Sequence, residues 1–171
     1  MHNFFKFNWF LRNVVYCLFY KNKNLFCYIG KPIFLRNFSN FIFSKHVRVF
    51  PNSRFECERN ATVIFGANIT IGQNCHITCG EKITIGDHTV ICPNVVISDI
   101  RHHYEDHIVP IIKQGFSTKP ILIGNNVFIG SNVIILPGAV ISDNAIIGAG
   151  TIVSGIVKKG EKRFYRVYKG K

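Results

Sequence analysis

The sequence has 171 residues, of which 47% are hydrophobic and 18% charged, and its formal net charge is +12. This length suits one domain with a real core, and this composition excludes wholesale disorder. Residues 1–60 carry a net charge of +8 and residues 155–171 carry +6, whereas residues 61–154 carry −2. A nucleic-acid reader usually places a basic face on its folded domain, so no nucleic-acid partner is predicted.

The six cysteines include no CxxC pair. This spacing does not predict a zinc or redox site, and we expect no metal. Reduced and mostly buried thiols are typical of a cytoplasmic protein, which is the location that we predict.

Residues 1–45 form an aromatic and basic segment, and its first 24 residues contain no acid. An unbroken apolar stretch and a cleavage site are absent, which predicts no secretory signal. Polar residues such as Lys6 and Arg12 interrupt any membrane span. The segment predicts an amphipathic helix with two open interpretations. It lies on the inner leaflet of the membrane as a peripheral anchor, or it packs on the body of the protein or its oligomer.

A six-residue repeat organises the middle of the chain. Aliphatic residues recur in one phase at Ile123, Ile129, Ile135, Ile141, Ile147 and Val153. Two further runs are Ile71, Ile77 and Ile83, and Ile85, Ile91 and Ile97. Glycines follow several of these positions, where we expect turns to need a permissive backbone: Gly72, Gly86, Gly124, Gly130 and Gly148. A short strand plus a turn, repeated as the sides of a coiled prism, explains this period. We predict a β-helix over 46–155, followed by a basic tail over 156–171.

The repeat stops between residues 99 and 120, in a polar segment that holds His102, His103 and His107. A polar loop extruded from a rigid solenoid is where function is usually found. An imidazole titrates near pH ~6.5 and can take the proton of a sugar hydroxyl as a general base.

The stretches IGDHTVICPNVVISDIRHHYED and KPILIGNNVFIGSNVIILPGAVISDNAIIGAGTIVSG resemble the hexapeptide-repeat acyltransferases of the galactoside, maltose and colanic-acid type. The resemblance implies an all-β fold, a left-handed parallel β-helix with an extruded loop. It also implies a homotrimer whose acceptor site lies between neighbouring subunits. The implied reaction transfers an acetyl group from acetyl-CoA to a saccharide hydroxyl.

Carried over by position, the family's catalytic base falls on His102, eight residues after Asn94. The backbone amide of Ser131 matches the donor that faces the thioester oxygen. Asp99 and Glu105 are candidates to orient the imidazole, and Arg101 stands where relatives have an acid. Asn94 and Tyr104 are expected to contact the substrate. The expected cofactor groove comprises Phe128, Gly130, Ser131, Ala149, Ser154, Lys158 and Lys159.

We therefore predict an O-acetyltransferase of capsule, O-antigen or exopolysaccharide biosynthesis. An N-terminus suited to the membrane surface favours this over N-acetylation of an amino-sugar nucleotide, because lipid-linked saccharides are assembled at the inner leaflet. A non-catalytic interaction protein is an alternative, favoured because the chain ends at Lys171 where relatives continue. A zinc enzyme resembling the gamma carbonic anhydrases is another. His102 and His107 have that family's ligand spacing, but His76 is out of register for the third ligand.

Overall fold

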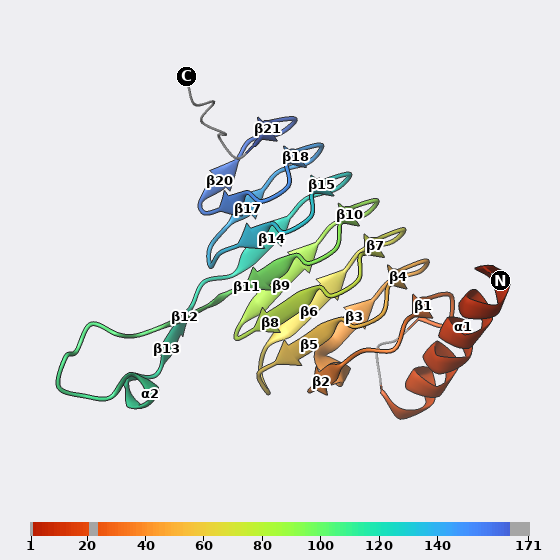
Figure 1. Cartoon of the computed structure of the whole chain (residues 1–171), viewed down its shortest axis with the longest axis horizontal. Coiled ribbons are helices and arrows are strands. Elements are labelled where there is room, and N and C mark those ends of the chain that lie inside the picture. Colours follow the sequence, from red (N-terminus) through yellow and green to blue (C-terminus); the bar gives the residue numbers. More distant parts are fainter. Residues whose placement is uncertain (1, 21–23, 165–171) are drawn as a thin grey trace, which may run out of the picture.

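In a computed structural model, which describes residues 2–20 and 24–164, the chain forms a parallel β-solenoid of about seven turns with a helix at its N-terminal end (Figure 1). This confirms the predicted β-helix with its extruded loop and N-terminal helix. Residues 165–171 of the predicted basic tail lie outside the described residues.

Three parallel sheets form the sides of the solenoid, and each coil adds a strand to each sheet. The first sheet contains β1 (Tyr28–Ile29), β4 (Arg48–Val49), β7 (Thr70–Ile71), β10 (Val90–Ile91), β15 (Phe128–Ile129), β18 (Ile146–Ile147) and β21 (Lys162–Arg163). The second contains β2 (Phe34–Arg36), β5 (Arg54–Cys57), β8 (His76–Cys79), β11 (Val96–Ser98), β16 (Ile134–Ile135) and β19 (Ile152–Val153). The third contains β3 (Phe41–Phe43), β6 (Thr62–Phe65), β9 (Lys82–Ile85), β14 (Ile121–Ile123), β17 (Val140–Ile141) and β20 (Ile156–Val157).

The chain passes from the first sheet to the second, then to the third, and back to the first. We call the corners where it does so the first edge (first to second sheet), the second edge (second to third) and the third edge (third to first). Each edge runs along the solenoid axis, because equivalent turns of successive coils stack on one another.

The core is one continuous column, and its composition changes along the axis. The aliphatic residues of the repeat fill it in the later coils, as Ile123, Ile129 and Ile135 illustrate, each at most 1% exposed. In the early coils phenylalanines replace them, and Phe43 stacks on Phe65 with ring centroids 4.7 Å apart. The coils therefore begin at Tyr28 and continue to Arg163, beyond the expected 46–155. The six-residue aliphatic repeat did not reveal the early coils, because several of their inward positions are aromatic instead of aliphatic.

The glycines of the repeat serve close packing between coils, which corrects the expectation that they supply a permissive backbone. Left-handed backbone at the corners belongs mainly to other residues, such as Asn74 (φ 57°) and Asn126 (φ 53°). A Cβ on Gly72 would lie 2.5 Å from the Pro93 nitrogen of the next coil. Only glycine fits where two turns approach so closely.

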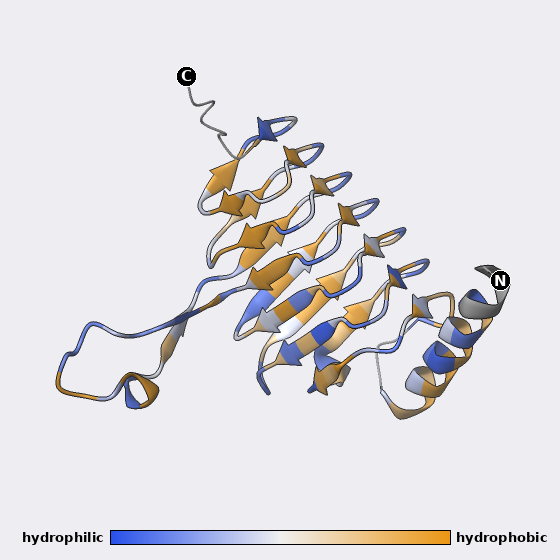
Figure 2. Cartoon of the chain, in the orientation of Figure 1, coloured by the Kyte–Doolittle hydropathy of each residue, from blue (hydrophilic) through white to orange (hydrophobic). Residues whose placement is uncertain are grey.

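The outward side chains divide the solenoid into two zones. Figure 2 shows hydrophilic residues on β5 and β8, whereas the strands β14 to β20 of the later coils are hydrophobic along their length. Leu122, Ile134, Ile152 and Ile156 are among the exposed apolar residues of these later coils. Exposed apolar faces of this kind mark surfaces that a partner covers.

Helix α1 (His2–Phe19) packs across the end of the solenoid beside β1 (Figure 1). Trp9 meets Phe50 edge to face at 5.2 Å between ring centroids, and Tyr16 meets Phe38 in the same way at 5.4 Å. The buried Asn13 donates from its side-chain nitrogen to the carbonyl of Asn24 at 2.8 Å. The prediction that an amphipathic helix packs on the body of the protein is therefore confirmed for the face of α1 that carries Trp9, Asn13 and Tyr16. In the part of the chain that the structure describes, no helix has the length and apolarity to cross a membrane.

Candidate active site

A β-hairpin interrupts the repeat at the second edge. Strands β12 (Ile100–His102) and β13 (Phe116–Thr118) pair antiparallel, with Arg101 opposite Ser117 and His102 opposite Phe116. Figure 1 shows the hairpin leaving the side of the prism, with the short helix α2 (Ile111–Gln114) near its tip. Because alternate residues of a strand point to opposite faces, His102 and Phe116 share one face while Arg101 and Ser117 share the other.

Asp99 fixes the base of this hairpin. Its carboxylate is fully buried and accepts backbone N–H groups of the preceding coil, from Gly80 at 2.6 Å and from Glu81 and Lys82 at 2.9 Å each. Its carbonyl accepts the N–H of Lys119 at 2.9 Å, where the chain returns to the solenoid. These bonds occupy both carboxylate oxygens, so within one chain Asp99 positions the hairpin and does not orient His102.

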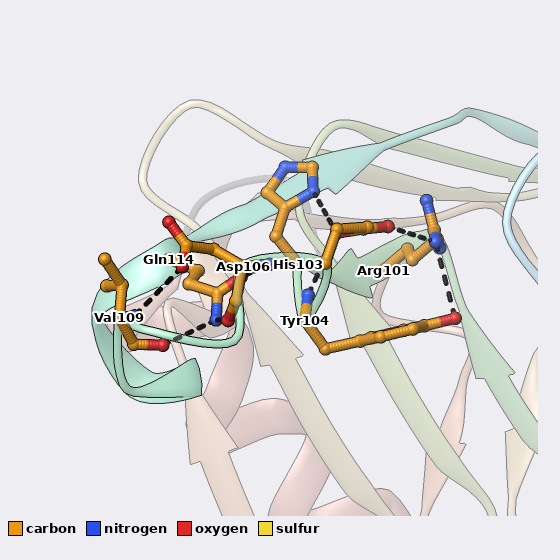
Figure 3. A network of polar contacts seen from close by, with 7 residues as sticks. Arg101, His103, Tyr104, Asp106, Val109 and Gln114 are labelled. Atoms are coloured by element: carbon orange, nitrogen blue, oxygen red, sulfur yellow. Dashed lines mark hydrogen bonds and ion pairs between the residues drawn. The ribbon is translucent and has the colours of Figure 1, made fainter.

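The acid expected to orient His102 from within the loop contacts other groups (Figure 3). Glu105 pairs with Arg101 and accepts the N–H of Tyr104 at 3.0 Å. These neighbours hold the pKa of Glu105 below its ordinary value, with the backbone N–H as the largest cause. Its other close partner is His103, at 3.7 Å from the imidazole Nδ1. Arg101 stands where the resemblance leads one to expect an acid. It forms an ion pair with the Glu105 carboxylate.

Asp106 holds the tip of the loop together. Its side chain accepts the N–H groups of Ile108 at 2.7 Å and Val109 at 3.1 Å, which hold the pKa of Asp106 below its ordinary value. Gln114 donates to the carbonyls of Asp106 and Val109 at 2.7 Å each (Figure 3). The loop therefore has a defined internal structure.

His102 makes no side-chain hydrogen bond to any described residue. Its ring lies edge to face with that of Phe116, with centroids 6.0 Å apart. Phe116 also lines a polar cleft of about 550 Å³ between the hairpin and the early coils. The other residues of this cleft are Arg36, Asn37, Glu58, Arg59, Asn60 and Gly80. An unpartnered imidazole beside a polar cleft can accept a proton from a bound hydroxyl.

A second cleft of about 340 Å³ lies on the opposite face of the hairpin, toward the later coils. Its lining residues are Ile100, Arg101, Ser117, Lys119, Leu136, Pro137 and Ser154. Two cations on a largely apolar wall suit a ligand that combines a chain of methylene and amide groups with phosphate. Of the expected cofactor residues, Ser154 lies here.

Asn94, Gly130, Ser131 and Ala149 lie together on the first edge. A Cβ on Gly130 would be 2.6 Å from the nitrogen of Ala149, so the two turns touch. The N–H of Ser131 has no acceptor among the described residues and is free to meet an oxyanion. Asn94 is a corner residue (φ 61°), and its side-chain oxygen accepts from Asn74 at 3.1 Å.

The expected site residues are thus distributed over different edges of one chain. His102, Tyr104 and Ser154 belong to the second edge, whereas Ser131 and its neighbours belong to the first. Lys158 and Lys159 follow β20 on the third edge. Phe128 is half exposed on the first sheet, where it pairs in register with Val90 and Ile146. A single copy brings neither Ser131 nor Lys158 to His102.

The sequence did not reveal Phe116, Arg59 or Lys119 as lining residues. Phe116 could have been found only from the hairpin register, which places it opposite His102. His76, considered as a metal ligand, contacts Glu56 at 3.1 Å and Thr78 at 2.9 Å. Within the described ranges, no three His, Cys, Asp or Glu side chains are grouped to hold a metal ion.

Comparison with known proteins finds transferases that are similar to this solenoid in sequence and in fold. Residues 120–155 match the family "Bacterial transferase hexapeptide (six repeats)". Galactoside O-acetyltransferase of Escherichia coli strain K12 is 44% identical over 99 residues, which are 53% of this chain and 46% of that protein. The putative lipopolysaccharide biosynthesis O-acetyl transferase WbbJ of the same strain is 26% identical over 147 residues, 82% of this chain and 74% of its own.

Among solved structures, the hexapeptide-repeat containing acetyltransferase VCA0836 of Vibrio cholerae, complexed with acetyl coenzyme A, superposes with a TM-score of 0.58. It is 28% identical and the match covers 65% of this chain and 60% of that one. The chain therefore carries the bacterial transferase hexapeptide repeat over residues 120–155 and is similar to known acetyltransferases. It spans about half the length of the galactoside O-acetyltransferase that it matches.

Proposed function

We propose that the protein transfers an acetyl group from acetyl-CoA to a hydroxyl of a saccharide. The observation that carries this proposal is the placement of His102, which has no hydrogen-bond partner among the described side chains and shares a hairpin face with Phe116 beside the polar cleft. The cofactor follows from the family and from the acetyl-CoA complex of VCA0836.

In the proposed reaction, His102 takes the proton of the acceptor hydroxyl while its oxygen attacks the thioester carbonyl carbon. The resulting tetrahedral oxyanion accepts the N–H of Ser131. Collapse of this intermediate breaks the carbon–sulfur bond, and the departing thiolate receives the proton from the imidazolium. A preorganised N–H of this kind typically contributes about 10²–10³-fold to turnover.

The separation of the two edges supports a site shared between copies of the chain, and we propose a homotrimer. The N–H of Ser131 and the imidazole of His102 meet only if the first edge of one subunit faces the hairpin of the next. The exposed Ile134, Ile152 and Ile156 on the second and third sheets flank the second edge and supply an apolar face for that contact.

The polar cleft favours a saccharide acceptor. Arg59 and Asn60 can donate to sugar oxygens, Glu58 can accept from them, and Phe116 offers a ring face. The likeness to galactoside O-acetyltransferase supports a sugar hydroxyl, and the likeness to WbbJ supports a unit of a surface polysaccharide, such as capsule, O-antigen or exopolysaccharide. We place the reaction in the cytoplasm, at the inner face of the membrane, because acetyl-CoA is made in that compartment and Cys57, Cys75, Cys79 and Cys92 form no disulfide.

The test is release of coenzyme A thiol from acetyl-CoA in the presence of a panel of free, nucleotide-linked and lipid-linked saccharides, with mass spectrometry of the product. We expect thiol release that depends on an acceptor and a mass gain of one acetyl group on oxygen. Calorimetry with acetyl-CoA separates the alternatives. Absence of both binding and thiol release would identify a non-catalytic solenoid.

A further inference from the structure

Helix α1 presents a second apolar face, opposite the one that packs on the solenoid. Its large exposed side chains follow helical spacing and form what we call the outer stripe: Phe7, Leu11, Val15, Leu18 and Phe19. Leu18 is 78% and Phe19 79% exposed, although both lie in the last turn of a helix whose other side is buried. The packing of α1 therefore leaves a continuous apolar face without a partner among residues 2–20 and 24–164.

A groove beside the outer stripe carries positive charge. It has a volume of about 550 Å³ and lies between α1 and the first coils, with Arg12 and Lys31 near Leu11 and Val15. Arg12 is held in place by donating to the carbonyl of Ile29 at 3.1 Å. Cations beside an apolar face match a lipid surface, whose phosphates lie next to acyl chains.

The charge of the whole N-terminal region decides between a lipid surface and a second copy of the chain. The first 55 residues contain nine Lys and Arg and no Asp or Glu. Two copies meeting through α1 would bring like charges together, whereas an anionic bilayer would neutralise them. No described helix can span the membrane, and the inner face of α1 is already packed, so the contact is one-sided.

We propose that the outer stripe of α1, with Arg12 and Lys31 beside it, docks the protein on the surface of an anionic phospholipid bilayer. The stripe enters the boundary between headgroups and acyl chains, and the two cations meet lipid phosphate. Because α1 covers the end of the solenoid while the hairpin leaves its side, docking leaves the hairpin accessible (Figure 1).

The experiment is sedimentation of the full chain with vesicles of phosphatidylcholine alone or of phosphatidylcholine with phosphatidylglycerol. We expect binding to the anionic vesicles only, and binding that weakens as salt rises. Trp9 is the only tryptophan and lies in the groove, so its emission should shift to shorter wavelength on binding. Leu11→Ser with Leu18→Ser should lower the partition coefficient by about tenfold or more. Lys31→Glu should lower it by about fivefold or more.

The matched controls remove equal apolar area or charge elsewhere. Ile108→Ser with Ile112→Ser changes two side chains of the loop that are 93% and 90% exposed, and Lys82→Glu reverses an exposed charge on β9. Both should bind vesicles as the unaltered protein does. We call Leu11→Ser with Leu18→Ser the stripe variant and Ile108→Ser with Ile112→Ser the loop variant. Equal vesicle binding by these two variants would overturn the proposal. A fall in oligomeric mass of the stripe variant, with no vesicle binding by the unaltered protein, would overturn it in favour of a second copy.

The test does not depend on the stripe variant remaining folded, because lipid composition and salt are varied with the unaltered protein. The readout is also independent of acetyl transfer. A protein that transfers acetyl groups but ignores anionic vesicles contradicts only the docking surface, and one that binds vesicles without transfer contradicts only the proposed reaction.

Discussion

His102 and Phe116 lie opposite each other across the β12–β13 ladder, with ring centroids 6.0 Å apart and ring planes at 69°. An edge-to-face contact restricts the imidazole without consuming either of its nitrogens. It also fixes the face of the hairpin on which the proposed base lies, the face that Phe116 turns to the polar cleft. Arg101 and Ser117, one pair inward, serve the opposite cleft, so the hairpin separates two binding spaces.

Asp99→Ala should destabilise the hairpin base without touching the reacting groups. The substitution leaves the N–H groups of Gly80, Glu81 and Lys82 without their acceptor, and a buried charged acceptor of several N–H groups is worth about 2–4 kcal/mol. Urea unfolding monitored by circular dichroism measures the change. Asp106→Ala, at the exposed tip, should cost much less. Equal effects of the two substitutions would contradict the anchoring role of Asp99.

Stability should fall in acid partly through Glu56. The guanidinium of Arg54 and the imidazole of His76 lower the pKa of Glu56, with Arg54 the larger cause. A lowered folded-state pKa stabilises the protein above the ordinary carboxyl pKa, and this stabilisation disappears as the pH falls through the lowered value. Glu56→Gln and Arg54→Gln should both flatten the pH dependence of the free energy of unfolding in that range. An unchanged slope in both variants would contradict this assignment.

The sequence predicted the later coils well because Ile and Val alone suit their inward positions, and the period survives without a gap from Ile123 to Val153. It did not predict the early coils, where rings such as Phe43 and Phe65 stack across coils. The sequence also did not predict that Asp99 fixes the base of the hairpin. This role depends on three N–H groups that only the stacking of coils brings close to Asp99.

The N-terminal helix shows a different limit. Packing on the body of the protein and contact with the membrane were the open alternatives in the sequence. The structure packs one side of α1 on the solenoid and leaves an apolar side exposed. Which residues face each way depends on the rotation of α1 about its own axis. That rotation is set by contacts such as Trp9 with Phe50, which join residues far apart in the sequence.

Mixing two inactive variants should restore activity if the site is shared between subunits. Gly130→Ala places a Cβ 2.6 Å from the nitrogen of Ala149 and must displace the Ser131 amide, so it should abolish turnover. When Gly130→Ala and His102→Ala are mixed in equal amounts, unfolded and reassembled, the mixture should recover about a quarter of the unaltered activity. Half of the subunits carry an intact Ser131 turn and half an intact His102, so about a quarter of the shared sites combine both. Ser131→Ala keeps the backbone N–H and should stay active. A mixture as inactive as its components would place both residues in one chain's site.

His102→Ala should lower turnover by about 10²–10⁴-fold, the usual contribution of a general base. The imidazole shares its hairpin face with Phe116, which lines the polar cleft. It has no hydrogen-bond partner among the described residues and can accept a proton. Acetyl-CoA affinity, measured by calorimetry, should change little, because none of the expected cofactor residues belongs to the hairpin that carries His102. His103→Ala is the matched control. Its ring lies beside Glu105, 3.7 Å away, and its N–H bonds to the carbonyl of Gly115 at 3.1 Å, so its loss should be mild. An inactive His103→Ala with an active His102→Ala would move the base by one residue, and full activity in both would exclude general-base catalysis by this loop.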